Sequence, residues 1–419
     1  MNKDRSKRIL ILTQFFWPEV RTIPMNLFNI GTDLVKKGYQ VTVITGFPNH
    51  PYGKIYDGYK MKIYSRESVN GIDIFRIPLF PDHSLSPIKR AVNFISFSLS
   101  AVFIGFFLIQ KIKIDMILTY MPPLTIGIPT FLFRRLHNVP VAYYVSDLWP
   151  ENLLASGAYI PKFLVKCIRV FEDWVYNQSD IICVNSPGYI SNLIGKGVLP
   201  RKIQLISDSV DSELFYPVKY DEHLAKKYGI ENKFNIIYGG NIGKVQALEV
   251  FISVANKLRD FENLQIVFIG DGTELGKLKR LVNKLSLDNV TFISRKPIEE
   301  ISKYFGLADI LFLHLNSHPA FKNQFPSKIS AYMACSKPIL CAVDGTAAKV
   351  IKESNAGLTC EPCNEREIIK AIKQFIQMDK TEHKLMSKNG RKMYEKNFTR
   401  EIQSNNFDEV IRKLIERAK

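Results

Sequence analysis

A glycine-rich segment, Tyr238-Gly239-Gly240-Asn241-Ile242-Gly243-Lys244, has the residue types needed to hold a phosphate group. It follows an apolar segment that predicts a strand, and it precedes a predicted helix. Glycines let the backbone approach a ligand closely, and the unpaired N–H groups of a helix N-terminus attract anions. The spacing matches neither a P-loop nor the dinucleotide fingerprint, which argues against NTPases and NAD enzymes. The alternative is a tight structural turn.

Two further segments of the second half could surround such a phosphate. Phe325-Pro326-Ser327-Lys328 has the proline and serine that favour a helix start, so that Lys328 adds a positive charge beside the helix dipole. Otherwise Lys328 is a solvated lysine on a helix surface. Gly270-Asp271-Gly272 ends another predicted strand, and it fits a structural turn as well as a ligand-binding loop.

A carboxylate stands at a matching place in the first half of the chain. Asp147, within Ser146-Asp147-Leu148-Trp149-Pro150-Glu151, comes just after a predicted strand. From the strand end, its side chain could orient or deprotonate a hydroxyl group of a substrate. The alternative is a helix N-cap, a position that aspartate often occupies.

The elements that must position these residues alternate between short apolar strands and amphipathic helices. In the first half, strands are predicted at Arg8–Leu12, Gln40–Thr45, Ile72–Ile77, Asp115–Leu118, Val139–Val145 and Ile181–Val184, and helices at Pro24–Lys37, Pro87–Ile112 and Pro161–Asn177. In the second half, strands are predicted at Asn235–Tyr238, Gln265–Ile269, Val290–Phe292, Ile310–His314 and Pro338–Ala342, and helices at Ala247–Asp260, Thr273–Leu285, Ile298–Phe305 and Pro326–Ala334. This order predicts two mainly parallel sheets, each covered by helices on both faces.

The sequence therefore predicts an α/β protein with two Rossmann-like, doubly wound domains that face each other across a cleft. The first spans residues 1–206 and the second residues 207–394, joined through the polar stretch Ser207–Glu231. Residues 395–419 predict a basic helix that packs back on the first domain. Ligands of such folds bind at the carboxyl ends of the strands, so the cleft is the expected site of chemistry.

The charge of the chain points to an anionic partner. Its 419 residues include 57 Lys and Arg against 40 Asp and Glu, a formal net charge of +17. Residues 1–202 carry 24 basic and 13 acidic residues, so most of the excess belongs to the first domain. A cationic surface attracts nucleic acid, anionic lipid or a phosphate-bearing substrate. We expect no nucleic acid, since the sequence lacks an interleaved aromatic and basic patch and a known binding module.

The six cysteines do not form a disulfide framework. Most of them lie in apolar segments, which indicates a reducing compartment, and the N-terminus lacks the pattern of a signal peptide. Cys360 and Cys363 form a C-x-x-C pair, but no second pair at matching spacing would complete a zinc site. The sequence also lacks an Asp-x-Asp motif suited to a divalent metal.

Residues 91–110 contain 20 consecutive residues without a charge, enough to span a bilayer. Three arrangements are open: a spanning helix, a helix buried in the core, and a helix that lies in the plane of the membrane interface. Spanning is disfavoured because the strands Ile72–Ile77 and Asp115–Leu118 should belong to one sheet. We favour the in-plane helix. Its lipid-facing residues would be Phe94, Phe97 and Ile104, and its flanking cations Lys89, Arg90, Lys111 and Lys113, joined by Arg134 and Arg135.

The motifs of the chain, taken together, resemble those of a known enzyme family. They are QFFWPE near the start, GYQVTVITGFPNHPYGKIYDGY, SDLWPE, SDSVDSELFYP, YGGNIGKVQALE, IVFIGDGTEL, FPSKISAYMACSKPIL and NAGLTCEP. On these motifs the chain resembles the family 4 glycosyltransferases of the GT-B fold. More narrowly, it resembles the L-fucosamine transferase group of bacterial O-antigen and capsule clusters.

The resemblance implies transfer of a sugar from a nucleotide diphosphate donor, with UDP as the expected nucleotide, retention of anomeric configuration, no cofactor and no obligatory metal. The catalytic residues would be Asp147 and Lys328. The donor would bind the second domain through Gly240, Asn241, Gly243, Lys244, Gly270, Asp271, Arg295, Ser327 and Lys328. The acceptor side would comprise Pro18, Glu19, Asn49, His50, Trp149 and Glu151.

The acceptor implied by the resemblance is a saccharide linked to a polyprenyl diphosphate, and the implied sugar is N-acetyl-L-fucosamine. Because such an acceptor cannot leave the membrane, the expected location is the cytoplasmic face of the bacterial inner membrane. We expect the enzyme to be held there peripherally, at an anionic membrane surface.

Two departures from the family pattern bear on the activity. Many members carry a Glu pair eight positions apart, where Asn323 and Ala331 stand in this chain, and Ser336 replaces a glycine. The first loop has Arg21-Thr22-Ile23-Pro24 in place of a glycine pair. The missing Glu pair motivates one alternative, a catalytically silent partner subunit of the same fold. A nucleotide-sugar epimerase of the same fold is the other.

Overall fold

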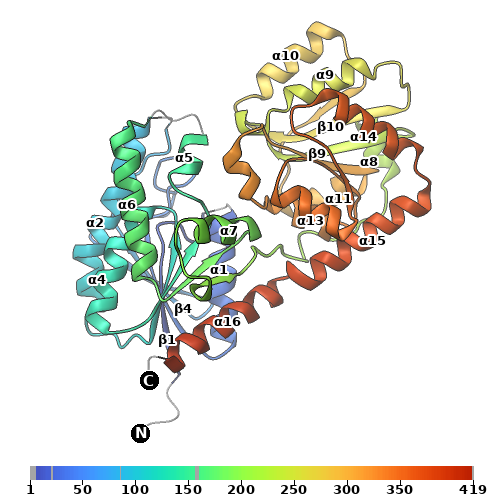
Figure 1. Ribbon diagram of the computed structural model, residues 1–419. Coiled ribbons are helices and arrows are strands. Elements are labelled where there is room, and N and C mark those ends of the chain that lie inside the picture. Colours follow the sequence, from blue (N-terminus) through green and yellow to red (C-terminus); the bar gives the residue numbers. More distant parts are fainter. Residues whose placement is uncertain (1–5, 20–21, 85, 156–159, 418–419) are drawn as a thin grey trace. The chain divides into compact units, whose positions relative to one another are not determined.

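The computed structural model describes residues 6–19, 22–84, 86–155 and 160–417. The chain divides into two compact units (Figure 1). Unit 1 comprises Met1–Asn185, Tyr189–Asp208 and Gln403–Lys419, and unit 2 comprises Ser186–Gly188 and Ser209–Ile402. The main division thus falls after Asp208, close to the predicted boundary, and the C-terminal segment from Gln403 is part of unit 1.

Unit 1 is built on an eight-stranded sheet in the order β3-β4-β2-β1-β5-β6-β7-β8. The strands are β1 (Arg8–Leu12), β2 (Gln40–Gly46), β3 (Ser65–Val69), β4 (Ile72–Ile77), β5 (Met116–Met121), β6 (Val141–Val145), β7 (Ile181–Val184) and β8 (Ile203–Leu205). Neighbouring strands are parallel, except that β3 pairs antiparallel with β4. The strand order reverses between β1 and β5, the kind of point at which α/β folds bind ligands.

Helices cover both faces of this sheet (Figure 1). On one face, α1 (Thr22–Lys36) and the unit 1 part of α16 (Arg400–Arg417) join an apolar core with the central strands. The helices of the other face are α2 (Pro87–Ser100), α3 (Phe106–Ile109), α4 (Gly127–His137), α6 (Lys162–Gln178) and α7 (Pro187–Gly195). A short helix, α5 (Glu151–Ala155), follows β6.

The predicted helix Pro87–Ile112 ends at Ile109 and consists of α2 and α3, joined by a π-helical turn at Ala101–Gly105. Its buried side includes Asn93, whose side chain accepts a hydrogen bond from Nε2 of Gln14 (2.7 Å). This polar contact places Asn93 on the side of the helix that faces the sheet. Phe97 comes one helical turn later and lies on the same side. Phe97 is 0% exposed, so its predicted membrane contact is wrong. Two other predicted lipid contacts, Phe94 and Ile104, are half-buried.

Unit 2 contains a six-stranded parallel sheet in the order β11-β10-β9-β12-β13-β14. The strands are β9 (Phe234–Asn241), β10 (Leu264–Asp271), β11 (Val290–Ile293), β12 (Ile310–His314), β13 (Ile339–Ala342) and β14 (Gly357–Thr359). The helices are α8 (Glu222–Lys227), α9 (Glu249–Lys257), α10 (Leu275–Leu285), α11 (Ile301–Gly306), α12 (Ser327–Ala334), α13 (Thr346–Ser354), α14 (Glu365–Gln377) and α15 (Lys380–Asn397). Buried side chains of α9, α10 and α14 form one core with the sheet, while α12 and α13 pack on β12 and β13.

The strand order of unit 2 reverses between β9 and β12. Both units therefore have a central strand from which the sheet is wound in two directions, with helices on both faces. The predicted fold class, two Rossmann-like α/β domains, is confirmed. The switch points also show where to look for ligands, at the carboxyl ends of β1 and β5 and of β9 and β12.

Candidate active site

The carboxyl end of β9 lies against the first turn of α12. Gly240, near the end of β9, has a φ of +135°, and a Cβ atom built there would lie 2.5 Å from Cε and 2.7 Å from Nζ of Lys328. Glycine suits this position because it tolerates the positive φ and leaves room for the lysine. The glycine loop and Lys328, distant in sequence, therefore lie together at the switch point of unit 2.

The side chain of Lys328 is half-buried. Its Nζ donates a hydrogen bond to the hydroxyl of Tyr238 and lies 4.1 Å from the centroid of that ring. Burial lowers the pKa of Lys328 to about 7, because desolvation disfavours the charged form. Among the described residues, no carboxylate charge offsets this effect. An anion bound here would supply the missing partner and restore the charge of the lysine.

The loop after Gly240 is held in shape by the side chain of Gln246. Its Oε1 accepts hydrogen bonds from N–H of Gly243 (3.2 Å) and from Nδ2 of Asn241 (3.1 Å). The N–H of Gly243 would therefore bind a phosphate only after exchanging this partner. The side chains of Asn241 and Lys244 are exposed, so a ligand could reach both from solvent.

His314, at the end of β12, connects this loop to the segment before α14. Its Nδ1–H donates to the carbonyl of Gln246 (2.7 Å), and its Nε2 accepts from N–H of Cys363 (2.9 Å). A histidine that donates with one nitrogen and accepts with the other is neutral, and burial lowers the pKa of His314 further. No residue near His314 in the sequence indicates this positioning role. Cys360 and Cys363 are both free thiols.

The segment Gly270–Gly272 lies beside the glycine loop because β10 pairs with β9. In the register of the two strands, Gly270 faces Gly240 and Asp271 faces Asn241. A Cβ atom on Gly270 would overlap the carbonyl oxygen of Gly240, so close backbone packing alone accounts for this glycine. The exposed Asp271 accepts a hydrogen bond at Oδ1 from N–H of Gly272 (2.7 Å).

Two other predicted donor residues lie at strand or helix ends of unit 2. Ser327 is the first residue of α12 and precedes Lys328. Arg295 follows β11, and its side chain is exposed. The predicted donor residues thus lie in the last residues of β9 and β10, just after β9 and β11, or at the start of α12, which places them along the carboxyl edge of one sheet.

In unit 1, Asp147 follows β6, next to the switch-point strand β5. Its Oδ1 accepts a hydrogen bond from Nδ2 of Asn152 (2.9 Å). Burial, together with the nearby charge of Asp208, raises the pKa of Asp147 to about 6. A carboxylate whose pKa lies just below neutrality suits a general base.

Asp208 is a second carboxylate near this strand edge, and no role was predicted for it from the sequence. Its Oδ1 accepts hydrogen bonds from Nδ2 of Asn26 (2.9 Å) and from the hydroxyl of Tyr144 (3.0 Å). Its Oδ2 accepts from Nδ2 of Asn185 (2.9 Å). Burial raises the pKa of Asp208 in spite of these donors. The sequence signal for it was its place in the motif SDSVDSELFYP.

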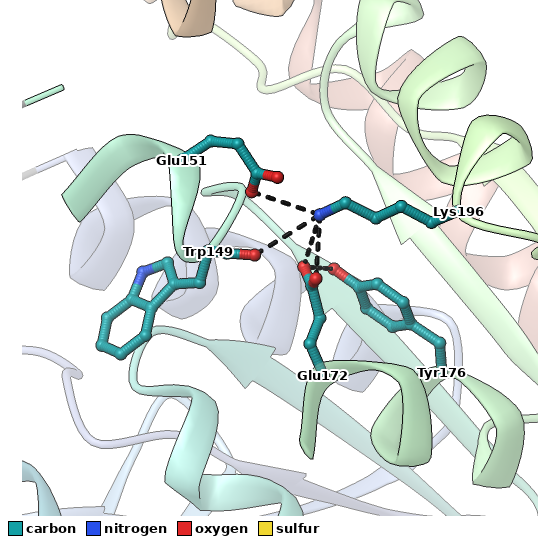
Figure 2. Close-up of polar contacts among 5 residues, drawn as sticks. All are labelled: Trp149, Glu151, Glu172, Tyr176 and Lys196. Atoms are coloured by element: carbon teal, nitrogen blue, oxygen red, sulfur yellow. Dashed lines mark hydrogen bonds and ion pairs between the residues drawn. The ribbon is translucent and has the colours of Figure 1, made fainter. Parts of the chain in front are cut away.

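The loop after β6 is anchored by a cluster of charged side chains (Figure 2). Nζ of Lys196 lies 3.2 Å from Oε2 of Glu151 and 2.8 Å from Oε2 of Glu172. The same Nζ donates to the carbonyl of Trp149 (3.4 Å), and Tyr176 donates from its hydroxyl to Oε1 of Glu172 (2.7 Å). Glu151, a predicted acceptor-side residue, is therefore engaged in holding this loop in place.

We expect Lys196→Met to destabilise unit 1 by about 3–5 kcal/mol, because it leaves a buried carboxylate without its cation. That carboxylate, Glu172, is only 1% exposed. Urea unfolding followed by circular dichroism measures the change. Lys162→Met, an exposed substitution at the start of α6, is the control, and a Lys196→Met curve that matches it would contradict the expectation.

The first loop of unit 1 brings three predicted acceptor-side residues together. Oε1 of Glu19 accepts hydrogen bonds from N–H of Asn49 (2.8 Å) and of His50 (2.8 Å). Burial raises the pKa of Glu19 to about 7. Glu19 and Asn49 are buried and brace the loop, whereas His50 and Pro18 are half-buried. Arg21, in the altered first loop, lies outside the described residues.

Two family models match most of the chain. The glycosyl transferase 4-like domain matches residues 28–208, and the glycosyl transferases group 1 domain matches residues 221–393. The chain belongs to the family 4 glycosyltransferases. Each family domain thus coincides with most of one of the two sheets.

Known relatives and solved structures resemble this glycosyltransferase over most of its length. It is 23% identical over 382 residues to WcaI of Escherichia coli, a glycosyl transferase named for colanic acid biosynthesis, covering 89% of this chain and 93% of that protein. It is 22% identical over 376 residues to N-acetyl-alpha-D-glucosaminyl L-malate synthase of Bacillus anthracis, covering 89% and 88%.

Among solved structures, sucrose-phosphate synthase from Thermosynechococcus elongatus matches with a TM-score of 0.76 at 16% identity, covering 98% of this glycosyltransferase and 100% of that chain. Anabaena Alr3699/HepE in complex with UDP matches with a TM-score of 0.73 at 14% identity, covering 97% and 100%. These likenesses show the GT-B fold.

The departures from the family pattern can be located in this glycosyltransferase. Asn323, at the end of a 3-10 turn, is half-buried, and Ala331 is buried within α12. Neither can supply the carboxylate that many members of the family carry there. In the part of the chain that the structure describes, no group of three or more His, Cys, Asp or Glu side chains is placed to hold a metal ion.

Proposed function

We propose that this glycosyltransferase moves a sugar, with retention of configuration, from a UDP-linked donor to a saccharide carried on a polyprenyl diphosphate. The observation that carries the proposal is Lys328, held against Gly240 without an offsetting carboxylate among the described residues. The diphosphate of a nucleotide sugar would supply the missing negative charge.

The proposed pathway is the synthesis of a bacterial surface polysaccharide, an O-antigen or a capsule. The relative WcaI is named for colanic acid biosynthesis, and the structural neighbour HepE was solved with UDP. Both names agree with the proposed pathway and nucleotide. N-acetyl-L-fucosamine is the sugar that we propose, on the basis of the sequence resemblance.

Charge development explains how unit 2 would catalyse this reaction. As the glycosidic bond breaks, negative charge grows on the bridging oxygen of the departing nucleotide diphosphate. Lys328 and the backbone N–H groups of the glycine loop, aimed at that oxygen, would stabilise the transition state more than the ground state. One preorganised donor of this kind contributes about 3–4 kcal/mol. Lys244 and Arg295 would add charge at the same edge.

Asp147 is the group that we propose for the acceptor. Its carboxylate would orient, or take a proton from, the hydroxyl that attacks the anomeric carbon. Retention requires this attack to come from the face that the diphosphate leaves. With a pKa of about 6, Asp147 is mostly ionised at neutral pH, so it is ready to accept a hydrogen bond. The half-buried Pro18, His50 and Trp149 would border the acceptor.

We propose that the enzyme works at the cytoplasmic face of the bacterial inner membrane. A polyprenyl chain keeps the acceptor in the bilayer, so the enzyme must reach it there. Residues 1–202 carry 24 basic and 13 acidic residues, a balance that favours an anionic lipid surface.

Two alternative functions are considered. The absence of a carboxylate at Asn323 and Ala331 favours the first, a catalytically silent subunit of the same fold. Such a protein would bind a nucleotide sugar but would neither transfer nor hydrolyse it. An epimerase, the other alternative, would convert a free nucleotide sugar without any acceptor.

A screen of nucleotide sugars for thermal stabilisation tests the proposal, because a ligand that binds only the native state raises the midpoint. We expect UDP-linked sugars to stabilise the protein and the selected sugar to be transferred to a polyprenyl-diphosphate-linked saccharide. Stabilisation without transfer would favour the silent subunit. Conversion of the donor in the absence of acceptor would favour the epimerase.

A further inference from the structure

One face of unit 1 is covered by α2, α3, α4 and α6, of which α2, α4 and α6 are labelled in Figure 1. Gly105, in the π-helical turn before α3, lies close to the ring of Phe133 on α4. Phe131, also on α4, meets Trp174 of α6 with ring centroids 5.0 Å apart. Helix α4 therefore connects the segment of α2 and α3 with α6, and together these three form one continuous layer over the sheet.

The side of this layer that faces away from the sheet is apolar. Along α2, the π-helical turn and α3, exposed apolar residues recur every three or four positions, as expected for one helical face. They are Ile88, Val92, Ile95, Leu99, Phe103 and Phe107. The other two helices add Ile128 and Leu136 on α4, and Phe163, Leu164, Val170 and Trp174 on α6. Phe107 is 68% exposed and Phe163 is 71% exposed, which is unusual for phenylalanine in a soluble fold.

The charges around this surface are mostly positive. Neither Pro87–Ile109 nor Gly127–His137 contains an acidic residue, and the acids of α6 are the buried Glu172 and the exposed Asp173. Exposed basic residues on or next to the three helices are Lys89, Arg90, Lys111, Lys113, Arg135, Lys162, Lys166 and Arg169. Arg134, which was expected among the membrane cations, pairs instead with Asp180 (3.0 Å).

We propose that this three-helix surface docks into the interface of an anionic bilayer, with α2 and α3 in the membrane plane and α6 as a second contact. An apolar face bordered by Lys and Arg is the pattern of helices that lie in a membrane interface. Each basic residue near anionic headgroups adds attraction, whereas a second copy of the same surface would bring like charges together. The surface thus differs from the one expected from sequence, both in its α2 residues and in including α6.

The other arrangements of α2 and α3 do not fit the structure. A spanning helix is excluded because β4 and β5, on either side of it, are strands of one sheet. A core helix would be mostly buried, but only 33% of an apolar 18-residue stretch within Pro87–Ile109 is buried. A surface helix with an unpaired apolar face is what remains.

The same helices hold the loop that carries Asp147. On one side, the ring of Phe94 from α2 lies 5.8 Å from the indole of Trp149. On the other side, Glu172 from α6 binds Lys196, which in turn binds Glu151 (Figure 2). Docking would therefore bring the loop close to the bilayer. This last step rests on the proposed function, because it gives the loop a lipid-linked acceptor to meet.

Flotation of the full chain with vesicles tests the docking surface. We expect binding to phosphatidylcholine vesicles that contain phosphatidylglycerol, weaker binding to phosphatidylcholine alone, and release by high salt. The double variants Phe103→Ser/Phe107→Ser and Phe163→Ser/Val170→Ser should each weaken binding about 10- to 100-fold, since each removes two exposed apolar anchors. Leu385→Ser, at an exposed apolar residue of α15 in unit 2, is the control and should bind as the wild type does.

Several results would overturn the proposal. One is a wild-type protein that does not bind the anionic vesicles. Another is unchanged vesicle binding by the Phe163→Ser/Val170→Ser variant, which would show that α6 does not contact the bilayer. A third is a wild-type dimer, seen by size-exclusion chromatography with light scattering, that the surface variants dissociate. Nucleotide-sugar stabilisation measured on the same variants keeps the donor site separate, so a failure of docking and a failure of the proposed function can be told apart.

Discussion

Replacing Lys328 with methionine is expected to lower kcat/KM for sugar transfer about 10²- to 10³-fold, the effect of removing one preorganised donor to developing charge. Methionine keeps an apolar stem beside Gly240, but it removes the charge and the hydrogen bond to Tyr238. The thermal midpoint should not fall, because folding of the variant no longer carries the free-energy cost of burying an ammonium group. Initial rates with the donor found by the thermal screen measure the effect.

Lys303→Met is the matched control, since Lys303 is an exposed lysine on α11 of the same unit. It should transfer sugar at the wild-type rate. If Lys328→Met also does so while remaining folded, the lysine has no part in stabilising the leaving group. A lost rate accompanied by a much lower thermal midpoint would instead indicate a structural role for Lys328.

Replacing Asp147 with asparagine should lower kcat/KM for the acceptor about 10²- to 10⁴-fold, the range expected for loss of a general base. Asparagine keeps the size of the side chain and an acceptor for Nδ2 of Asn152. At saturating donor, the wild-type kcat/KM for the acceptor should rise with pH through about 6, because a base acts in its ionised form. The variant should lack this pH dependence, and its donor affinity should be unchanged.

Asp173→Asn serves as the control for Asp147→Asn, since Asp173 is an exposed carboxylate on α6 of the same unit. It should leave both the rate and its pH dependence unchanged. The base assignment would be refuted by an Asp147→Asn variant that keeps the wild-type pH profile. A uniform loss of rate at every pH, with that profile retained, would point to orientation of the loop.

Much of the fold could be predicted from the sequence, because buried parallel strands are short apolar segments between amphipathic helices. β1, β4 and β12 have the predicted bounds. β3 escaped prediction because Ser-Arg-Glu-Ser-Val has no apolar run. It is an edge strand whose position depends on antiparallel pairing with β4. The buried side of α2 was mispredicted because Asn93 is recognised as a core residue only through Gln14, far away in sequence.

Some residues of the candidate site could likewise be predicted from the sequence, and others could not. The glycine loop, Lys328 and Asp147 are recognisable because the residue type and the adjoining strand or helix end are both local in sequence. Lys196, His314 and Asp208 were missed because each acts through partners that only the folded chain brings near. Nothing in the sequence around Lys196, for example, shows that two carboxylates, Glu151 and Glu172, converge on its ammonium group.

The most direct test of the charge proposed at Lys328 is isothermal titration of UDP at pH 8 in two buffers of different ionisation enthalpy. Free Lys328, with a pKa of about 7, is mostly neutral at this pH, and a bound diphosphate would raise its pKa so that a proton is taken up. The terminal phosphate of UDP is already ionised, since the second pKa of a phosphate is about 6. We expect uptake of about one proton per UDP by the wild type and none by Lys328→Met. Equal uptake by the two proteins, or none by the wild type, would contradict the claim that this lysine meets the diphosphate.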